Sequence, residues 1–281
     1  MKKTVINSYH LYISKSGLGS ETLRFAFVTD LHNQVSDGQG KRLLEMIRTQ
    51  RPDAILCGGD MIVGKPHQTV EPALQFMLQL AKEYPVYCGT GNHEYRVKIY
   101  AETYPGMYEA YHGPLREAGV VFLENQDKYL CIRGIPIVIY GYDMDRFYYE
   151  RFKRRFVSVS EMRSILGEPD GQAVSVLLAH NPAQMNTYFR WGADLTLCGH
   201  YHGGIVRLGE HRGLISPDFR LFPDNVHGLY EKNGKKIIVS AGLGEHTLPV
   251  RIHNPRELVM IELTIHGTEK NNGYSCKASG V

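Results

Sequence analysis

Short apolar runs alternate with segments of helical periodicity along most of this chain. The runs predicted as buried strands are residues 23–29, 54–57, 85–88, 173–179 and 195–198, and the first predicted helices are residues 38–50 and 71–83. Parallel strands joined by a helix have their carboxyl ends at the same edge of a sheet. The polar residues that follow these runs are therefore expected to lie close together.

The rest of the chain predicts further elements of both kinds. Residues 4–14 are predicted as an edge strand, and residues 98–118 as a helix that Pro105-Gly106 interrupts. The remaining predicted elements are short strands at 120–124, 129–132 and 136–140, which make the sheet partly antiparallel, helices at 160–167 and 182–190, and strands at 235–240 and 257–265. No repeat or interdomain linker is present, which predicts an α/β fold of one domain over residues 1–266 with a polar, frayed tail at 267–281.

The composition is that of an ordinary globular protein, with 43% hydrophobic and 22% charged residues in a chain of 281. A formal net charge of +3 is too small to favour a specific nucleic-acid partner. The five cysteines are odd in number and widely spaced, mostly in apolar runs, which predicts reduced thiols rather than a disulfide framework. The first residues lack the apolar core of a signal peptide, and no run reaches the roughly 18 apolar residues of a spanning helix. We therefore expect a cytoplasmic protein.

Residues that can bind a metal follow five of the predicted strands. They are Asp30 and His32, Asp60, Asn92 and His93, His180, and His200 and His202. Any one of these groups also fits a solvent-facing loop, but five of them in succession favour a shared site. Carboxylates, imidazoles and one amide, without thiolates, suit Mn²⁺, Fe or Zn²⁺ and argue against a structural zinc site.

Segment 146–156 is unusually basic and aromatic. It contains five basic residues, one glutamate and five aromatic residues. One interpretation is a surface helix that packs its rings on the body of the protein. The other is a cationic, aromatic lip beside a pocket for an anionic or lipid-bearing substrate. The basic residues assigned to this lip are Arg151, Lys153, Arg154 and Arg155.

The order of the polar residues resembles the signature of the calcineurin-like metallophosphoesterases. That signature runs Asp-x-His, Gly-Asp, Gly-Asn-His-Glu, His and Gly-His-x-His, and here it extends from Asp30 to His202. Residues 177–182, 199–204, 242–252 and 255–258 resemble the bacterial YkuE/YaeI-type branch in particular. The resemblance implies a four-layer α/β/β/α sandwich with mixed sheets and a dinuclear metal site at the strand ends.

The resemblance also assigns a role to each of these residues. One metal ion would be held by Asp30, His32 and His202, the other by Asn92, His180 and His200, with Asp60 bridging the two. The ions would be divalent or of mixed valence, with Mn as the first choice and Fe or Zn as alternatives. They would share a hydroxide that attacks phosphorus. His93 would act as the general acid for the leaving group, with an acidic partner that stays open among Asp30, Asp60 and Glu94.

Departures from other branches narrow the expected function. The residues after Asp60 include neither the tyrosine of the purple acid phosphatases nor the Asp-Arg-Gly of the protein serine/threonine phosphatases. The predicted activity is metal-dependent hydrolysis of a phosphodiester, pyrophosphate or phosphomonoester bond in a small or lipid-linked substrate. The alternatives are a pyrophosphohydrolase for a UDP-sugar lipid, a nuclease and a catalytically inactive scaffold.

The expected location differs from that of many YkuE/YaeI-type relatives. Those relatives carry an export signal or a membrane anchor, and neither is evident in this sequence. Peripheral contact with the inner face of the membrane remains compatible with a basic lip. The sequence predicts no particular oligomeric state.

Overall fold

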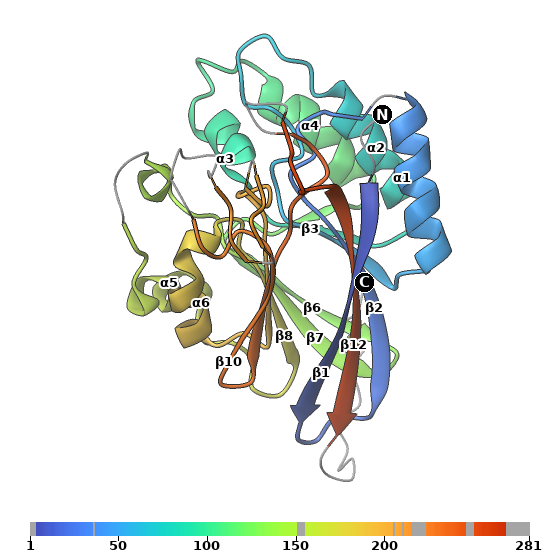
Figure 1. Ribbon diagram of the computed structural model, residues 1–281, viewed down its shortest axis with the longest axis vertical. Coiled ribbons are helices and arrows are strands. Elements are labelled where there is room, and N and C mark those ends of the chain that lie inside the picture. Colours follow the sequence, from blue (N-terminus) through green and yellow to red (C-terminus); the bar gives the residue numbers. More distant parts are fainter. Residues whose placement is uncertain are drawn as a thin grey trace.

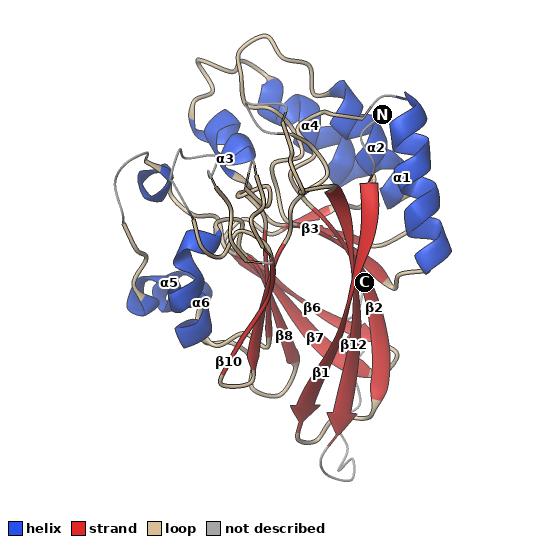
Figure 2. Ribbon diagram, in the orientation of Figure 1, coloured by secondary structure: helices blue, strands red, loops and turns tan. Residues whose placement is uncertain are grey.

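The computed structural model describes residues 4–35, 37–150, 155–204, 206–209, 211–214, 223–245 and 250–267. Two mixed sheets of six strands face each other, and helices cover the outer face of each (Figure 1). Loops gather above the upper ends of the strands, between the two groups of helices (Figure 2). The predicted four-layer α/β/β/α sandwich is confirmed.

The first sheet has the strand order β1-β12-β2-β3-β4-β5. Its strands are β1 (Thr4–Lys15), β2 (Glu21–Val28), β3 (Ala54–Cys57), β4 (Val86–Cys88), β5 (Val121–Phe122) and β12 (Arg256–Gly267). Strands β2 to β5 are parallel, whereas β12 runs antiparallel to β2. The predicted edge strand at 4–14 is confirmed, because β1 lies at the end of the sheet and pairs with β12.

The second sheet has the strand order β10-β11-β9-β8-β7-β6. Its strands are β6 (Gln126–Ile132), β7 (Ile135–Gly141), β8 (Val174–Leu178), β9 (Leu195–Cys198), β10 (Gly228–Lys232) and β11 (Lys235–Val239). The four central strands are parallel, and each outer strand is antiparallel to its neighbour. Strand β10 was not predicted, because its sequence, Gly-Leu-Tyr-Glu-Lys, is only partly apolar and the strand lies at the edge of the sheet.

Alternating side chains along each strand divide the core into layers. In β2, Phe25 and Phe27 point between the sheets, whereas Ala26 and Val28 pack under the helices of the first sheet. Those helices include α1 (Asp37–Gln50), α2 (Glu71–Ala81) and α4 (Met107–Glu117), and the second sheet is covered by α5 (Val159–Leu166) and α6 (Met185–Trp191). None of the helices in the described part of the chain is long and apolar enough to cross a bilayer.

The segment between β4 and β5 differs from its prediction. Helix α3 (Asn92–Ile99) begins directly after the strand exit, and α4 begins after Gly106, whose φ is 68°. The single interrupted helix predicted at 98–118 is therefore wrong in its first half. The helix predicted at 182–190 begins with a 3₁₀ turn, η2 (Pro182–Gln184), before α6.

The described cysteines depart from their prediction at one position, and Cys276 lies outside the described residues. Cys57, Cys88 and Cys198 are buried free thiols, as expected. Cys131 in β6 is disulfide-bonded, so the expectation of five reduced thiols is wrong there. Most of the tail predicted to be frayed lies outside the described residues.

Candidate metal centre

Five strand ends bring the predicted ligands to one place. Strands β2, β3 and β4 of the first sheet lead to Asp30, Asp60 and Asn92, whereas β8 and β9 of the second lead to His180 and His200. The prediction that all five strands share one sheet is therefore wrong. The chain crosses from one sheet to the other between β5 and β6, and the apolar pattern alone does not reveal that crossing.

Five of these polar residues have a left-handed backbone. The φ angles are 53° for Asp30, 50° for His32, 53° for Asp60, 66° for His200 and 48° for His202. This conformation costs a residue other than glycine about 1–2 kcal/mol. Strain of this kind persists where the surrounding structure enforces it and is concentrated at functional sites. The concentration at these residues therefore supports a functional role for this end of the sandwich.

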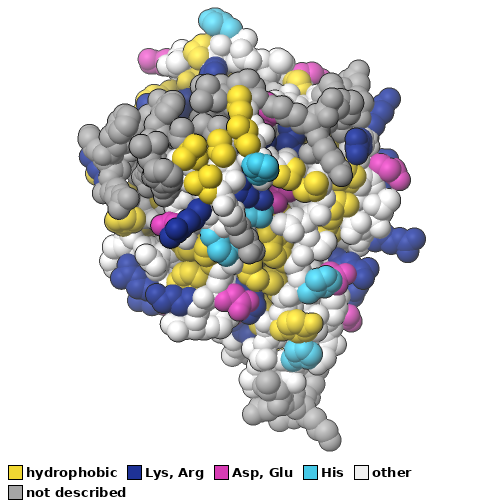
Figure 3. All heavy atoms as spheres, viewed as in Figure 1, with side chains coloured by type: hydrophobic (Ala, Val, Ile, Leu, Met, Phe, Trp, Pro, Cys, Tyr) yellow, Lys and Arg dark blue, Asp and Glu magenta, His cyan; other side chains and the backbone are white. Residues whose placement is uncertain are grey.

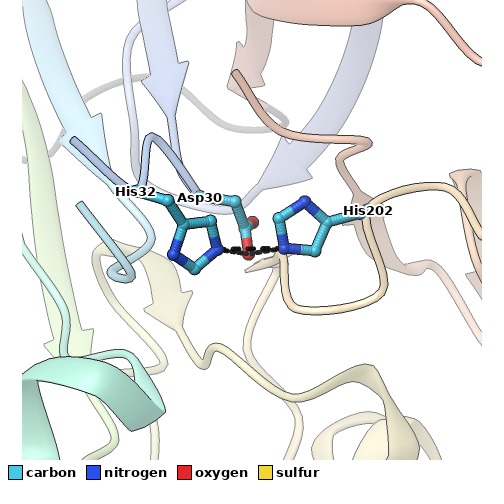
Figure 4. A group of neighbouring side chains, drawn as sticks. All are labelled: Asp30, His32 and His202. Atoms are coloured by element: carbon cyan, nitrogen blue, oxygen red, sulfur yellow. Dashed lines mark hydrogen bonds and ion pairs between the residues drawn. The ribbon is translucent and has the colours of Figure 1, made fainter. Parts of the chain in front are cut away.

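Asp30, His32 and His202 form the first cluster of metal-ligating side chains. His202 Nε2 lies 3.2 Å from Asp30 Oδ1 and 3.0 Å from His32 Nε2. Both rings point at the carboxylate of Asp30 (Figure 4). Thr29 Oγ1 donates a hydrogen bond to Asp30 Oδ2 at 2.9 Å, and the backbone N–H of His200 donates to Asp30 Oδ1 at 3.0 Å. The carboxylate is therefore fixed in position, with two imidazoles facing it.

Asp60, His180 and His200 form a second cluster, and Asn92 lies at the end of the neighbouring strand. The ring of His180 donates from Nδ1 to the carbonyl oxygen of Gly58 at 2.8 Å, so its Nε2 faces Asp60 Oδ2 at 3.1 Å. Asn92 Oδ1 is buried and accepts no hydrogen bond from any described residue. Buried acceptors that lack a donor fit a bound cation.

Asp60 lies between the two clusters. Its Oδ2 is 3.1 Å from His180 Nε2 and 4.0 Å from His32 Nε2. Its Oδ1 accepts the backbone N–H of His93 at 2.8 Å. One oxygen is thus held by the protein, and the other faces both sets of imidazoles.

The pKa values indicate how the metal-free site is charged. Burial disfavours charge on His180, but the Asp60 carboxylate outweighs it and raises the pKa of His180 to about 10. Burial likewise opposes a charge on Asp60, yet the His180 ring holds the pKa of that carboxyl well below its usual range. For His32, burial prevails and lowers the pKa to about 4. A metal ion at His180 Nε2 would displace a proton, so metal binding here is coupled to proton release.

His93 is held differently from the other imidazoles. The backbone N–H of Gly64 donates to His93 Nδ1 at 2.8 Å. Because Nδ1 accepts, the ring proton is on Nε2, where it can be given to a substrate but blocks a bond to metal. A ring nitrogen of His93 lies within 4.8 Å of ligand atoms of His32 and Asp60. This geometry supports a role as proton donor beside the clusters.

Glu94 has a positioning role that sequence reasoning missed. Its carboxylate accepts backbone N–H bonds from Asp60 at 2.7 Å, Met61 at 2.7 Å and Ile62 at 3.2 Å. Burial, together with the charge of Asp60, raises the pKa of Glu94 to about 7. The motif Gly-Asn-His-Glu contained this residue, but only as a candidate partner of His93. Its carboxylate instead supports the turn that carries Asp60.

The predicted lip begins at the second cluster. Its first residues form the 3₁₀ turn η1 (Arg146–Tyr149), and the Tyr149 ring lies 5.3 Å from the His200 ring at an interplanar angle of 72°. Arg155 pairs with Glu150 at 3.4 Å, and its guanidinium carbon lies 3.3 Å from the ring centroid of Phe147. Arg151, Lys153 and Arg154 lie outside the described residues. Among the described residues of segment 146–156, the turn η1 is the helical part, and the prediction of a longer surface helix falls partly outside the described residues.

A comparison with known protein families matches residues 23–204 to the family described as "Calcineurin-like phosphoesterase". The match covers well over half of the chain. The chain belongs to this family. The matched residues include every predicted ligand from Asp30 to His202, so the buried His/Asp clusters are those of a metallophosphoesterase.

Individual bacterial proteins are similar over much of the chain. An uncharacterized metallophosphoesterase of Aquifex aeolicus (strain VF5) is 24% identical over 265 residues, which cover 92% of this chain and 91% of that protein. YpbG of Bacillus subtilis (strain 168) is 26% identical and covers 68% of this chain, and the match spans 66% of YpbG. YkuE of the same organism is 25% identical, over 79% of this chain and 72% of YkuE, which confirms the predicted resemblance.

Solved structures are similar at lower identity. Phosphopantetheinyl hydrolase PptH from Mycobacterium tuberculosis aligns with a TM-score of 0.47 and 15% identity, over 79% of this chain and 89% of PptH. The calcineurin-like phosphoesterase YfkN from Bacillus subtilis aligns with a TM-score of 0.42 and 13% identity, over 80% of this chain and 82% of that structure.

Proposed function

We propose that this chain hydrolyses phosphoric ester bonds with two metal ions held where the two sheets meet. The observation that carries the proposal is the position of Asp60 Oδ2, which faces His180 at 3.1 Å and His32 at 4.0 Å. One ion would be held by Asp30, His32 and His202, the other by Asn92, His180 and His200, and both by Asp60. When bound, such a pair of ions activates a water for attack on phosphorus and neutralises charge on the phosphoryl oxygens.

The donor set determines which metals fit. Imidazole nitrogens, carboxylate oxygens and one amide oxygen suit Mn²⁺, Fe and Zn²⁺, in a divalent or mixed-valence pair. All of these side chains other than Asn92 are at least nine-tenths buried, and Asn92 contributes a buried oxygen. This burial also argues against the alternative of an inactive scaffold, because buried charged groups are retained at a cost unless they bind something.

In the proposed reaction, His93 protonates the oxygen that leaves phosphorus. The N–H of Gly64 keeps the ring proton on Nε2, on the side of the ring away from Gly64. His93 follows Asn92 directly at the start of α3, so one residue contributes an amide oxygen and the next a proton. The bond cleaved is a phosphodiester, a pyrophosphate or a phosphomonoester.

Metal analysis followed by a panel of esters tests this function. We expect two metal equivalents per chain and hydrolysis that is lost on chelation and restored by Mn²⁺. The panel compares a nitrophenyl phosphomonoester, a bis-nitrophenyl diester and a nucleoside diphosphate sugar. A protein that binds two ions but hydrolyses no ester would contradict the reaction, and one that binds a single ion would contradict the dinuclear site.

A lipid-linked phosphoester, such as a UDP-sugar lipid, is the second candidate substrate. It is favoured by the position of Tyr149 against His200, which puts the start of segment 146–156 beside the second cluster. Phe147 and Phe156 in this lip are 49% and 62% exposed. On the face of the molecule drawn in Figure 3, hydrophobic, basic and histidine side chains lie close together. A substrate with an apolar tail and an anionic head would find both kinds of contact there.

Vesicle binding tests this second candidate. Replacing Arg151, Lys153, Arg154 and Arg155 with Gln should weaken binding to anionic vesicles by about 1 kcal/mol per residue, more strongly at low salt. Arg155 should contribute least, since it already pairs with Glu150. The matched control replaces four exposed basic residues elsewhere: Lys41, Arg42, Lys65 and Lys82. Equal losses in the two variants, or no binding by the parent protein, would rule out the lip as a lipid contact.

A further inference from the structure

Arg251 is a partly buried arginine beside the first cluster, and the proposed reaction gives it no role. Its Nη2 donates to the carbonyl oxygen of Ala241 at 2.7 Å and to that of Gly244. Its Nη1 lies 3.4 Å from the carbonyl oxygen of His202, and Nη2 lies 3.4 Å from Nδ1 of the same residue. Burial lowers the pKa of Arg251 to about 10, so the guanidinium stays charged at neutral pH.

Residues 241–244, whose carbonyl oxygens accept hydrogen bonds from Arg251, are also bonded to Asp30 and Thr29 on the other side of the first cluster. The N–H of Gly244 donates to the carbonyl oxygen of Asp30 at 2.6 Å, and the N–H of Leu243 to that of Thr29 at 3.0 Å. The contact is close, because a Cβ atom on Gly242 would lie 2.6 Å from Asp30 Cβ. Arg251 therefore connects the backbone of Asp30, through residues 241–244, to the backbone of His202.

The turn that carries His202 needs such support. His202, Gly203 and Gly204 all have positive φ angles, of 48°, 69° and 72°. Asn254 Nδ2 donates to the carbonyl oxygen of His202 at 2.6 Å and to that of Gly204. Arg251 and Asn254, three residues apart in sequence, thus both contact the same strained turn.

We propose that Arg251 is a positioning residue that sets the affinity of the Asp30–His32–His202 cluster for its metal ion, with Asn254 as its partner. The inference rests on the proposed function for the assignment of that ion. The second cluster is supported by other groups, since His180 donates to Gly58 and Glu94 holds the turn of Asp60. Removing Arg251 should therefore affect one metal site and spare the other. Loss of a group that orients a metal ligand typically weakens metal binding by about 10–100-fold.

The test measures Mn²⁺ affinity separately at each cluster. Asn92→Ala weakens metal binding at the second cluster, so the tighter site measured in this background is the first cluster. In a His202→Ala background the tighter site is the second cluster. Arg251→Met should weaken Mn²⁺ binding by about 10–100-fold in the first background and leave it unchanged in the second. Arg251→Lys should recover part of the affinity, because lysine keeps the charge. The recovery should be incomplete, because lysine lacks the two terminal nitrogens of the guanidinium.

Two controls separate positioning from a general loss of stability. Arg212→Met removes an arginine whose side chain is 76% exposed and pairs with Asp224, and it should change neither affinity. If Arg251→Met does not fold, Asn254→Ala takes its place and should show the same selective loss. An equal loss at both clusters, or no loss at the first, would overturn the inference. A parent protein that binds no metal would instead overturn the proposed function.

Discussion

Asp60→Asn should release both metal ions and reduce turnover by about 10³-fold or more. Asp60 Oδ1 is held by the N–H of His93, and Oδ2 faces His32 and His180. If the new asparagine keeps its oxygen on the N–H of His93, its NH2 group faces the positions of both ions. If the side chain flips, the NH2 group instead faces the N–H of His93, and that hydrogen bond is lost. Stabilisation of the transition-state charge by metal ions is worth several kcal/mol in such reactions. A loss of about 4 kcal/mol corresponds to a fall of about 10³-fold in rate.

The measurement is metal content and turnover of the purified variant, with thermal unfolding recorded in the presence of a chelator. Asp127→Asn is the matched control, because Asp127 is exposed on β6, and it should behave as the parent. Glu94 holds the turn of Asp60 through backbone N–H groups that the substitution keeps, so the metal-free variant should fold. Retention of two ions with full turnover would show that Asp60 does not bridge.

His93→Ala should keep both metal ions yet lose about 10²–10⁴-fold in turnover of an alkyl phosphodiester. The Gly64 N–H directs the His93 proton to Nε2, which makes this ring a donor. An alkoxide needs a proton as it leaves, whereas a nitrophenolate hardly does. The loss should therefore be much smaller on a nitrophenyl ester of the same charge.

Asn92→Ala is the informative comparison, since it changes the adjacent residue. It should deplete the second ion and slow both esters alike, because the amide oxygen of Asn92 is a candidate ligand. His10→Ala, on the exposed face of β1, should change neither metal content nor turnover. The general-acid role fails if His93→Ala removes metal or slows the two esters equally.

Much of this site was predictable from the sequence because its chemistry lies at strand ends. Each ligand follows an apolar run, and an apolar run that ends in Asp or His is visible without a structure. The assignment of individual strands to the two sheets was not predictable, because Val121–Phe122 and Gln126–Ile132 are separated by only three residues and nothing in that short connection marks a change of sheet.

The supporting groups were harder to predict, for a physical reason. Glu94 and Arg251 act through backbone N–H and carbonyl groups, which every residue possesses, so no partner in the sequence identifies them. The start of α3 at Asn92 was missed because a polar, glycine-preceded segment of this kind also fits a loop. The left-handed backbone at Asp30 and His202 is likewise imposed by distant contacts.

The division of the proposed ligands between the two sheets would make the stability of the protein depend on metal supply. Asp30 and Asp60 follow strands of one sheet and His180 and His200 strands of the other, and the layer between the sheets is apolar. An ion bound by both halves would favour only the docked arrangement, and free metal at a hundred times its Kd would add about 2.7 kcal/mol per proposed site to the free energy of unfolding. When metal is scarce, that increment would disappear and the sheets would separate more often. Proteases act on such opened chains, so the abundance of the protein would follow the metal status of the cell.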